Sequence, residues 1–162
     1  MARCLVDLGL RTSDVAQLSL DQIDWRHCRV TLAPGKSKRE RTLPMPITTT
    51  CALIDYVLYA RPVTQDRHVF VHHRAPLGQG VQASTVRCVV RRAYARAEFK
   101  DSESQPHRLR HTMATRLLQS GNSLKTIADV LGHQSIDTTT RYTHVDRPSL
   151  LAVAMPWPGR VK

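Results

Sequence analysis

The spacing of apolar residues in the second half of the chain constrains the fold most, because it is the spacing of consecutive helices. Apolar residues recur three and four positions apart after Ser84, at Val86, Val89, Val90, Ala93, Tyr94 and Ala97. The same spacing returns over 107–118 and 124–131, and Gly121 and Gly132 follow these two stretches as glycines follow helix C-termini. Three amphipathic helices are therefore predicted, and helix should predominate in the fold.

The first half mixes helices with short strands. Helices are predicted around residues 4–8, from Thr12 or Ser13, and over about 48–61, where Pro62 ends the last. Residues 28–33 alternate polar and apolar, Pro34 and Gly35 make a turn, and 41–44 return as a second strand. We expect an α+β fold, mostly α, in which this hairpin and Val69–Val71 form a small antiparallel three-stranded sheet.

The charge of the chain favours an anionic partner. The 162 residues include 24 Lys and Arg against 13 Asp and Glu, a formal net charge of +11. A surplus of this size is typical of proteins that bind nucleic acid, although it also occurs in basic proteins with other functions. We expect DNA contacts from the tip of the hairpin and from the outer face of the helix over 84–99, unless these are simply solvated charges. The residues are Lys38, Arg39, Arg41, Arg87, Arg91 and Arg92.

Several other classes of protein are disfavoured. The four cysteines lie far apart without a Cys-x-x-Cys pair, which argues against a zinc knuckle and against a secreted disulfide framework. His72 and His73 are adjacent on a predicted strand and should point to opposite faces. No apolar run approaches the length of a membrane span, and no signal peptide or P-loop is present. We expect no cofactor, no metal and no membrane, in a bacterial-type cytoplasm or on its nucleoid DNA.

Three motifs in the last third of the chain carry chemistry. They are Pro-His-Arg-Leu-Arg-His at 106–111, Leu-Gly-His at 131–133 and Thr-Thr-Arg-Tyr-Thr-His at 139–144. Short consecutive helices could bring their histidines, an arginine and a tyrosine to one point. Fixed cationic donors beside a hydroxyl nucleophile suit a phosphodiester better than a carbonyl. The sequence therefore predicts a site that cleaves DNA strands.

These motifs, with Gly-Leu-Arg-Thr-Ser-Asp-Val at 9–15 and the basic hairpin, closely resemble the tyrosine recombinase (phage integrase) family. The resemblance runs from about Leu5 to Val145, in order and with the family's spacing. It implies a catalytic set of two arginines, a lysine, two histidines and a tyrosine nucleophile. By motif position these are Arg11, Lys36, His107, Arg110, His133 and Tyr142, with Lys38 as the alternative lysine.

The chemistry of phosphodiester cleavage gives each of these residues a role. Two guanidinium forks, Arg11 and Arg110, can hold the non-bridging oxygens as charge builds on them. A tyrosine with a pKa near ~10 is a weak nucleophile at neutral pH, so Tyr142 needs a proton acceptor, for which His107 is the nearest candidate. His133 would donate to the phosphate or the nucleophile, and Lys36 would protonate the departing 5′ oxygen. A phosphotyrosine link stores the energy of the broken bond, so resealing requires neither ATP nor metal.

The resemblance also implies an organisation. Residues 1–147 would form the catalytic domain, and 148–162 a tail whose Leu150, Leu151, Val153 and Met155 dock on a neighbouring protomer or fold back on their own core. The expected partners are double-stranded DNA and further copies of the chain, as a tetramer. The family's separate N-terminal DNA-binding domain, and the first helix of the catalytic domain, are expected to be missing here. Two alternatives to a recombinase remain: a DNA-binding remnant without activity, and a type IB topoisomerase.

Overall fold

The structure is a computed structural model that describes residues 1–34, 40–99 and 105–132. The predicted site residues Lys36, Lys38, Arg39, His133 and Tyr142 lie outside the described residues, as does the tail from 148. In chain order the elements are α1 (Ala2–Asp7), α2 (Thr12–Gln17), η1 (Leu20–Gln22), β1 (Ile23–Asp24), β2 (Arg29–Leu32), β3 (Arg41–Pro44), α3 (Ile47–Asp55), η2 (Tyr56–Ala60), α4 (Ala83–Arg96), α5 (Pro106–Gln119) and α6 (Leu124–Leu131).

The sheet is antiparallel and three-stranded, in the order β1, β2, β3. The predicted hairpin is confirmed: Val30 pairs with Leu43, and Leu32 pairs with Arg41. The prediction that Val69–Val71 form the third strand is wrong, because β1 takes that place, with Ile23 opposite Val30. The turn between β1 and β2 is tight, and the Asp24 carboxylate caps it by accepting from the His27 backbone N–H at 3.0 Å.

The segment Val69–Val71 is buried, as predicted, but it pairs elsewhere. The Val69 N–H donates to the Leu18 carbonyl at 2.7 Å, and the Val81 N–H donates to the Phe70 carbonyl at 3.1 Å. Leu18 precedes η1, and Val81 follows the loop after Val71. Because the segment pairs with these residues, it does not pair with a strand of the sheet. Three consecutive apolar residues indicate that a segment is buried, but they do not indicate which backbone groups it will pair with.

The predicted helices are present, and their ends follow from local residues. Ser123 caps α6, its hydroxyl accepting from the Thr126 N–H at 3.1 Å, and Gly132 ends α6 in the left-handed region at φ +62°. Neither Thr12 nor Ser13 caps α2, contrary to expectation. Arg11 is the N-cap residue, and the Asp14 carboxylate accepts from the Arg11 backbone N–H at 3.0 Å.

Apolar side chains form two clusters of very different size. The first cluster joins α1, α2, the sheet, α3, the 69–81 segment and α4, and includes Leu5, Val30 and Val86. The second lies between α5 and α6 and contains Ala114, Ile127 and Leu131. Val89 was predicted to face inward, but 40% of it is exposed, because α4 packs on the body along a narrower stripe through Val86 and Val90.

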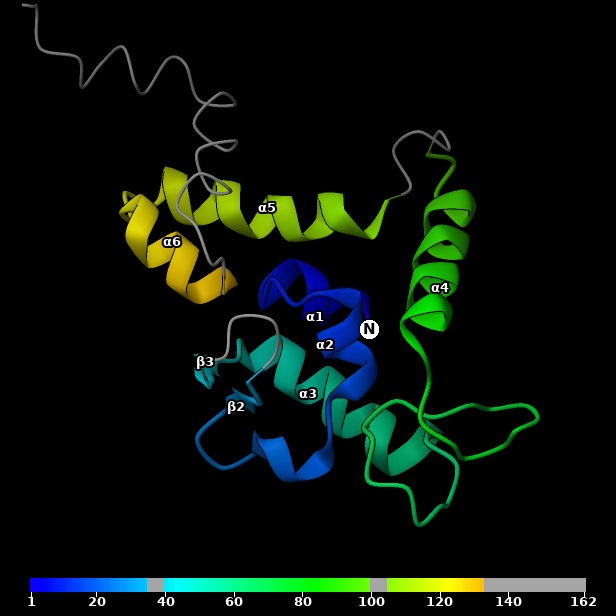
Figure 1. Ribbon diagram of the computed structural model, residues 1–162. Coiled ribbons are helices and arrows are strands. Elements are labelled where there is room, and N and C mark those ends of the chain that lie inside the picture. Colours follow the sequence, from blue (N-terminus) through cyan, green and yellow to red (C-terminus); the bar gives the residue numbers. More distant parts are fainter. Residues whose placement is uncertain (35–39, 100–104, 133–162) are drawn as a thin grey trace, which may run out of the picture.

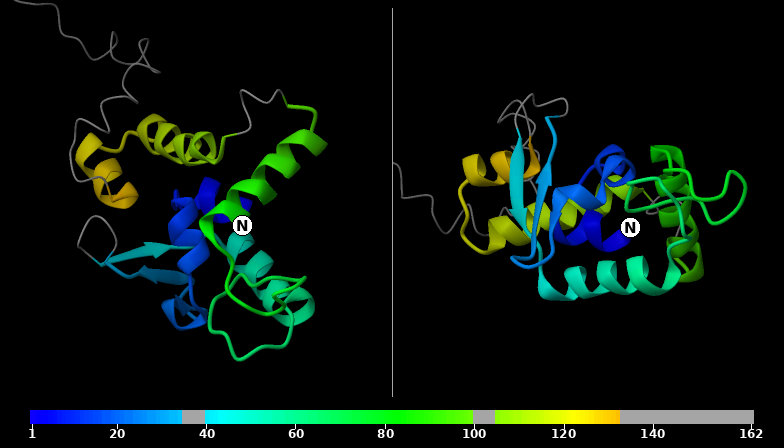
Figure 2. Two further views of the ribbon diagram at one scale, coloured as in Figure 1. Left: turned by 45° about the vertical axis from the view of Figure 1, so that its right-hand side comes forward. Right: turned by 90° about the horizontal axis from the view of Figure 1, so that it is seen from below.

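The arrangement in space brings the two halves of the chain together. In Figure 1, α1 and α2 lie between α5 and α3, while α4 stands at one end of α5 and α6 at the other. Figure 2 shows α6 beside the β2–β3 hairpin. A hydrogen bond from Arg41 of β3 to the Val130 carbonyl of α6 confirms this neighbourhood. Among the described residues, no helix has the length and apolar character needed to cross a membrane.

Candidate active site

Three of the predicted catalytic residues lie on one cleft. Arg11 comes from the turn before α2, and His107 and Arg110 come from the first two turns of α5. The cleft has a volume of about 1120 Å³ and is walled by α2, α4 and the start of α5. The structure thus joins residues that stand about a hundred positions apart in the sequence.

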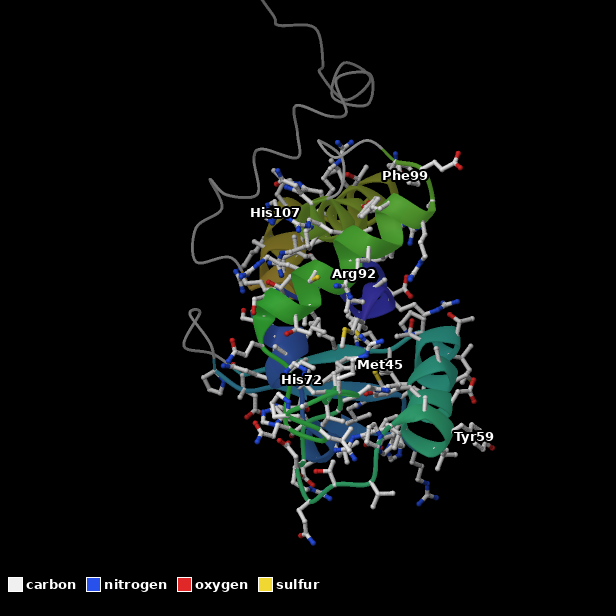
Figure 3. All side chains as sticks on the ribbon, turned by 90° about the vertical axis from the view of Figure 1, so that its right-hand side faces the viewer. Met45, Tyr59, His72, Arg92, Phe99 and His107 are labelled. Atoms are coloured by element: carbon white, nitrogen blue, oxygen red, sulfur yellow. The ribbon has the colours of Figure 1, made fainter. Side chains whose placement is uncertain are left out.

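The cleft is strongly basic. Five arginines line it, and none of its described lining residues is a carboxylate. Besides Arg11 and Arg110, these are the three arginines of α4 that were predicted to contact DNA: Arg87, Arg91 and Arg92. All three are exposed. Figure 3 shows Arg92 on α4 and His107 on α5. Such a surface attracts an anionic ligand and has the donors to bind phosphate.

Arg110 is buried although it is charged. Only 2% of the residue is exposed, and its guanidinium donates to the carbonyl oxygens of Gly9 and Leu131. These two carbonyls belong to the α1–α2 turn and to the last residue of α6. A buried guanidinium needs such partners, because an unpaired charge away from water is costly. Arg110 therefore fixes the position of its own fork and connects three segments of the chain.

Two further arginines donate to the same end of α6. The Arg11 Nη2 lies 2.9 Å from the Gly132 carbonyl oxygen, and the Arg41 Nη1 lies 2.8 Å from that of Val130. With Arg110 at Leu131, three consecutive carbonyls each accept from a different arginine. The last carbonyls of a helix have no partner within the helix and carry the negative end of its dipole, so they are natural acceptors for cations.

Asp14 completes this group and was not predicted as a site residue. One of its carboxylate oxygens accepts the Arg11 backbone N–H at 3.0 Å and lies 3.8 Å from the Arg41 Nη2. Its position three residues after Arg11, at the third residue of a helix, is a typical capping position and could have identified it. Arg41 itself was predicted to contact DNA, but its side chain lies against α6 and is only 14% exposed. Burial lowers the pKa of Arg41.

His107 lies at the mouth of the cleft. Pro106 occupies the first position of α5, where a missing N–H costs nothing, and places His107 in the first turn. The residue is exposed, and its ring lies 4.3 Å from that of His111, nearly perpendicular to it. His111 was not predicted as a site residue. Its position four residues after His107, on the same face of a helix, was the available signal.

No group of three metal-binding side chains exists within the ranges 1–34, 40–99 and 105–132. The ring of His73 stacks on Tyr56, and its Nε2 lies 3.2 Å from the tyrosine hydroxyl. All four cysteines are free thiols, and Cys88 lines the cleft among the α4 arginines.

Comparison with known proteins gives one consistent result. Residues 1–148 match the phage integrase family. A putative integrase/recombinase of Sinorhizobium fredii, y4rA, is 38% identical over 162 residues, which is all of this chain and 39% of that protein. The tyrosine recombinase XerC of Staphylococcus aureus is 32% identical over 154 residues, covering 95% of this chain and 51% of XerC. The chain thus spans about half or less of the length of these two relatives.

Solved structures agree on the fold. The XerA recombinase superposes with a TM-score of 0.79 at 28% identity, covering 92% of this chain and 53% of XerA. The XerH site-specific recombinase, in a post-cleavage complex with its palindromic difH substrate, superposes with a TM-score of 0.72 at 24% identity. That match covers 96% of this chain and 44% of XerH. The arrangement of helices and sheet is therefore one that recombinases share.

Proposed function

Because this chain belongs to the phage integrase family, we propose that it cleaves and rejoins DNA strands through a 3′-phosphotyrosyl intermediate. The observation that carries the proposal is the cleft, in which Arg11, His107 and Arg110 meet. Their residue types and their order along the chain are those that the sequence predicted for this reaction. The biological outcome would be integration, excision or another site-specific recombination.

The two arginines supply the electrostatic part of the reaction. Attack on a phosphodiester adds charge to its non-bridging oxygens, and two guanidinium groups stabilise that charge if they are already in place. The guanidinium groups of Arg11 and Arg110 are oriented by the carbonyls of Gly132 and Leu131. A guanidinium has five N–H donors, so each can bind a helix carbonyl and a phosphate oxygen at the same time. The protein itself would therefore set the orientation of both guanidinium groups.

The remaining steps are assigned from the sequence. The Tyr142 hydroxyl attacks phosphorus and forms the phosphotyrosine bond, while its proton passes to His107. The bond to the 5′ oxygen breaks, and that oxygen takes a proton from Lys36, or from Lys38 if the hairpin is shifted in register. His133 donates a hydrogen bond to the phosphate. Attack by a new 5′ hydroxyl reverses these steps and reseals the strand without ATP or metal.

Double-stranded DNA is the proposed substrate. The DNA backbone would follow the basic face of α4, where Arg87, Arg91 and Arg92 neutralise phosphates. Lys38 and Arg39 of the hairpin tip would supply further phosphate contacts. We further propose that the protein acts in the bacterial cytoplasm, as a tetramer on its DNA. The tail from 148 to 162 would join the protomers.

The test is mass spectrometry of the protein after incubation with nicked DNA duplexes that trap the cleaved strand. Incubation is done without divalent metal and without ATP, and the unmutated chain is compared with Tyr142→Phe. We expect a covalent nucleotide adduct on Tyr142 in the unmutated chain and none in the variant. DNA affinity should be nearly equal in the two, since the hydroxyl is a small part of the contact surface.

Each result has a clear meaning. An adduct that requires Tyr142 establishes the nucleophile and the independence from metal and ATP. Binding of DNA by a folded sample, without any adduct, would instead support the alternative of a DNA-binding remnant. Plasmid relaxation without any sequence requirement would select the topoisomerase. Because phosphate contacts release counterions, affinity should also fall steeply with salt concentration, and a flat response would contradict the proposed DNA path.

A further inference from the structure

We propose that Arg41 is a positioning residue of the cleavage site: it holds the end of α6 and the Asp14 carboxylate so that Arg11 stays oriented toward the cleft. This inference rests on the proposed function. Arg41 lies on β3, outside the residues that line the cleft, so it would act through Arg11 and not by touching the substrate.

The contacts form a closed group. Arg41 donates to the Val130 carbonyl at 2.8 Å, and its other Nη lies 3.8 Å from the Asp14 carboxylate. The same carboxylate oxygen accepts the Arg11 backbone N–H, and the Arg11 side chain donates to the Gly132 carbonyl at 2.9 Å. Arg11 is thus held at its backbone by Asp14 and at its guanidinium by the end of α6. Arg41 contacts the Asp14 carboxylate directly and the same end of α6 through the Val130 carbonyl.

Burial explains why this position needs a guanidinium. The Arg41 and Asp14 side chains are 14% and 21% exposed, so losing either partner would leave a charge poorly solvated. The planar fork donates a hydrogen bond to the Val130 carbonyl with one Nη and forms an ion pair with the Asp14 carboxylate through the other. The single ammonium of a lysine could not serve both with the same geometry. A residue that only tracked phosphate would be exposed and interchangeable with lysine.

Gly132 fits the same group sterically. A Cβ added at Gly132 would lie 2.5 Å from the Arg41 Cζ, closer than such atoms approach. The left-handed backbone at φ +62° also favours glycine there. With a side chain at residue 132, the Arg41 guanidinium would have to move from its present position. Arg41 and Gly132 should be coupled, although they stand far apart in the sequence.

Arg41 also lies where the β2–β3 hairpin meets the end of α6. It pairs with Leu32 in the last residue pair of β2 and β3, next to the connection between the two strands. Its guanidinium thus connects the base of the hairpin to the end of α6. Any shift of one of these segments would be transmitted to Asp14 and Arg11. A misplacement of about 1 Å at a reacting group can cost on the order of 100-fold in rate.

The first experiment measures strand cleavage at saturating DNA in Arg41→Ala, Arg41→Lys and the control Arg29→Ala. Arg29 is an exposed arginine on β2 of the same hairpin, and its substitution by alanine removes the same charge. We expect cleavage in Arg41→Ala to fall by about 10-fold to 100-fold, with DNA affinity changed less than about threefold. Arg41→Lys should keep the melting temperature but still cleave slowly, and Arg29→Ala should cleave normally. Equal rates in all of these proteins would overturn the proposal.

A second experiment does not depend on activity. NMR of the arginine guanidinium groups, with DNA absent, reports whether the Arg11 side chain is held. Arg11 should give resolved, slowly exchanging Nη signals in the unmutated chain and in Arg29→Ala, and exchange-broadened signals in Arg41→Ala and Arg41→Lys. If the unmutated chain forms no DNA adduct, the proposed function fails, whereas these signals still decide whether Arg41 positions Arg11. Arg11 signals that are unchanged in both Arg41 variants would overturn the inference.

A double-mutant cycle keeps the test independent of any one variant's stability. Gly132→Ala strains the backbone in every background, but it meets the arginine only when Arg41 is present. The melting temperature should therefore fall less when Gly132→Ala is added to Arg41→Ala than when it is added to the unmutated chain. The two losses should add when Gly132→Ala is combined with Arg29→Ala. Additive losses in the Arg41 cycle would contradict the contact.

Discussion

The region around α1 to α4 and the region of α5 and α6 are held together in different ways. The described residues include 18 buried members of the first cluster and three of the second. The first region therefore has a large apolar core. The α5–α6 region has a small one, and its end is fastened by arginines that donate to backbone carbonyls.

This difference bears on how accurately the proposed site is positioned. The arginines proposed to hold phosphate also hold the helix that completes the cleft. Apolar packing is insensitive to direction, whereas a hydrogen-bonded guanidinium fixes both distance and angle. The region that must be placed accurately is the one fastened by directional contacts. Stability and site geometry should therefore respond separately to substitutions in the two regions.

The largest effect is expected from Leu5→Ala in the first cluster. Leu5 is 1% exposed, and truncation leaves a cavity in the main core, so the free energy of unfolding should fall by about 2–5 kcal/mol. Urea unfolding followed by circular dichroism measures it. The control is Leu58→Ala, since Leu58 is 65% exposed and should change stability by less than about 0.5 kcal/mol. Equal losses in the two variants would mean that the first core does not dominate stability.

Arg110→Ala should destabilise α6 while leaving the region of α1 to α4 as stable as before. It removes the donor to Gly9 and Leu131, which should cost about 1.5–3 kcal/mol locally because the hydrogen bonds come from a charged group. Native-state hydrogen exchange should show faster exchange in α6, with the amides of β2 and α3 protected as before. Arg116→Ala, at an exposed position on the same helix, serves as control. Uniform loss of protection throughout the chain would show that the regions open together.

Ser123→Ala tests the other end of α6. The hydroxyl accepts from the Thr126 N–H, and its loss should cost about 1 kcal/mol. Hydrogen exchange should accelerate within α6, with less effect elsewhere. Ser13→Ala is a matched control, because the Ser13 side chain does not cap a helix. An unchanged exchange rate in α6 would mean that the Ser123 cap contributes little to holding this helix.

The smallest effect is a pH dependence confined to the first region. Hydrogen bonds from the backbone and side chain of His68, and from the Gly80 N–H, lower the pKa of Asp66 from its ordinary 3.8 to about 2. A carboxylate whose folded pKa lies below its unfolded value stabilises the protein above the unfolded pKa. That contribution is lost as the pH falls from about 4 towards 2. Asp66→Asn should remove this part of the acid dependence of the melting temperature, and an unchanged slope would contradict the assignment.

The sequence predicted the helices well because their signals are local. The three-and-four spacing of α5 and α6, the Ser123 cap and the left-handed Gly132 all depend on residues within a turn or two. The hairpin of β2 and β3 was also predicted, from alternation and a Pro-Gly turn. The site residues Arg11, His107 and Arg110 were predicted by motif, and the structure places all three on one cleft.

Features that depend on distant partners were missed. Val69–Val71 read as a strand of the sheet, but its partners are set by where Leu18 and Val81 lie in space. The group formed by Arg11, Asp14, Arg41 and the carbonyls at the end of α6 joins segments up to 121 positions apart, and its long-range contacts leave no pattern along the chain. Arg41 stands in a basic run, so its charge suggested exposure, whereas the fold buries it.

The contact between Arg11 and Gly132 can form only after both residues have been synthesised. Arg11 leaves the ribosome before its partner Gly132, which follows 121 residues later. At translation rates of roughly 5–20 residues per second, on the order of ten seconds pass between them. The first core can form during that interval, but the Arg11 guanidinium lacks its carbonyl partner until the end of α6 emerges. A chain whose translation stops early would therefore carry the basic surface without an assembled site, and could bind DNA without cutting it.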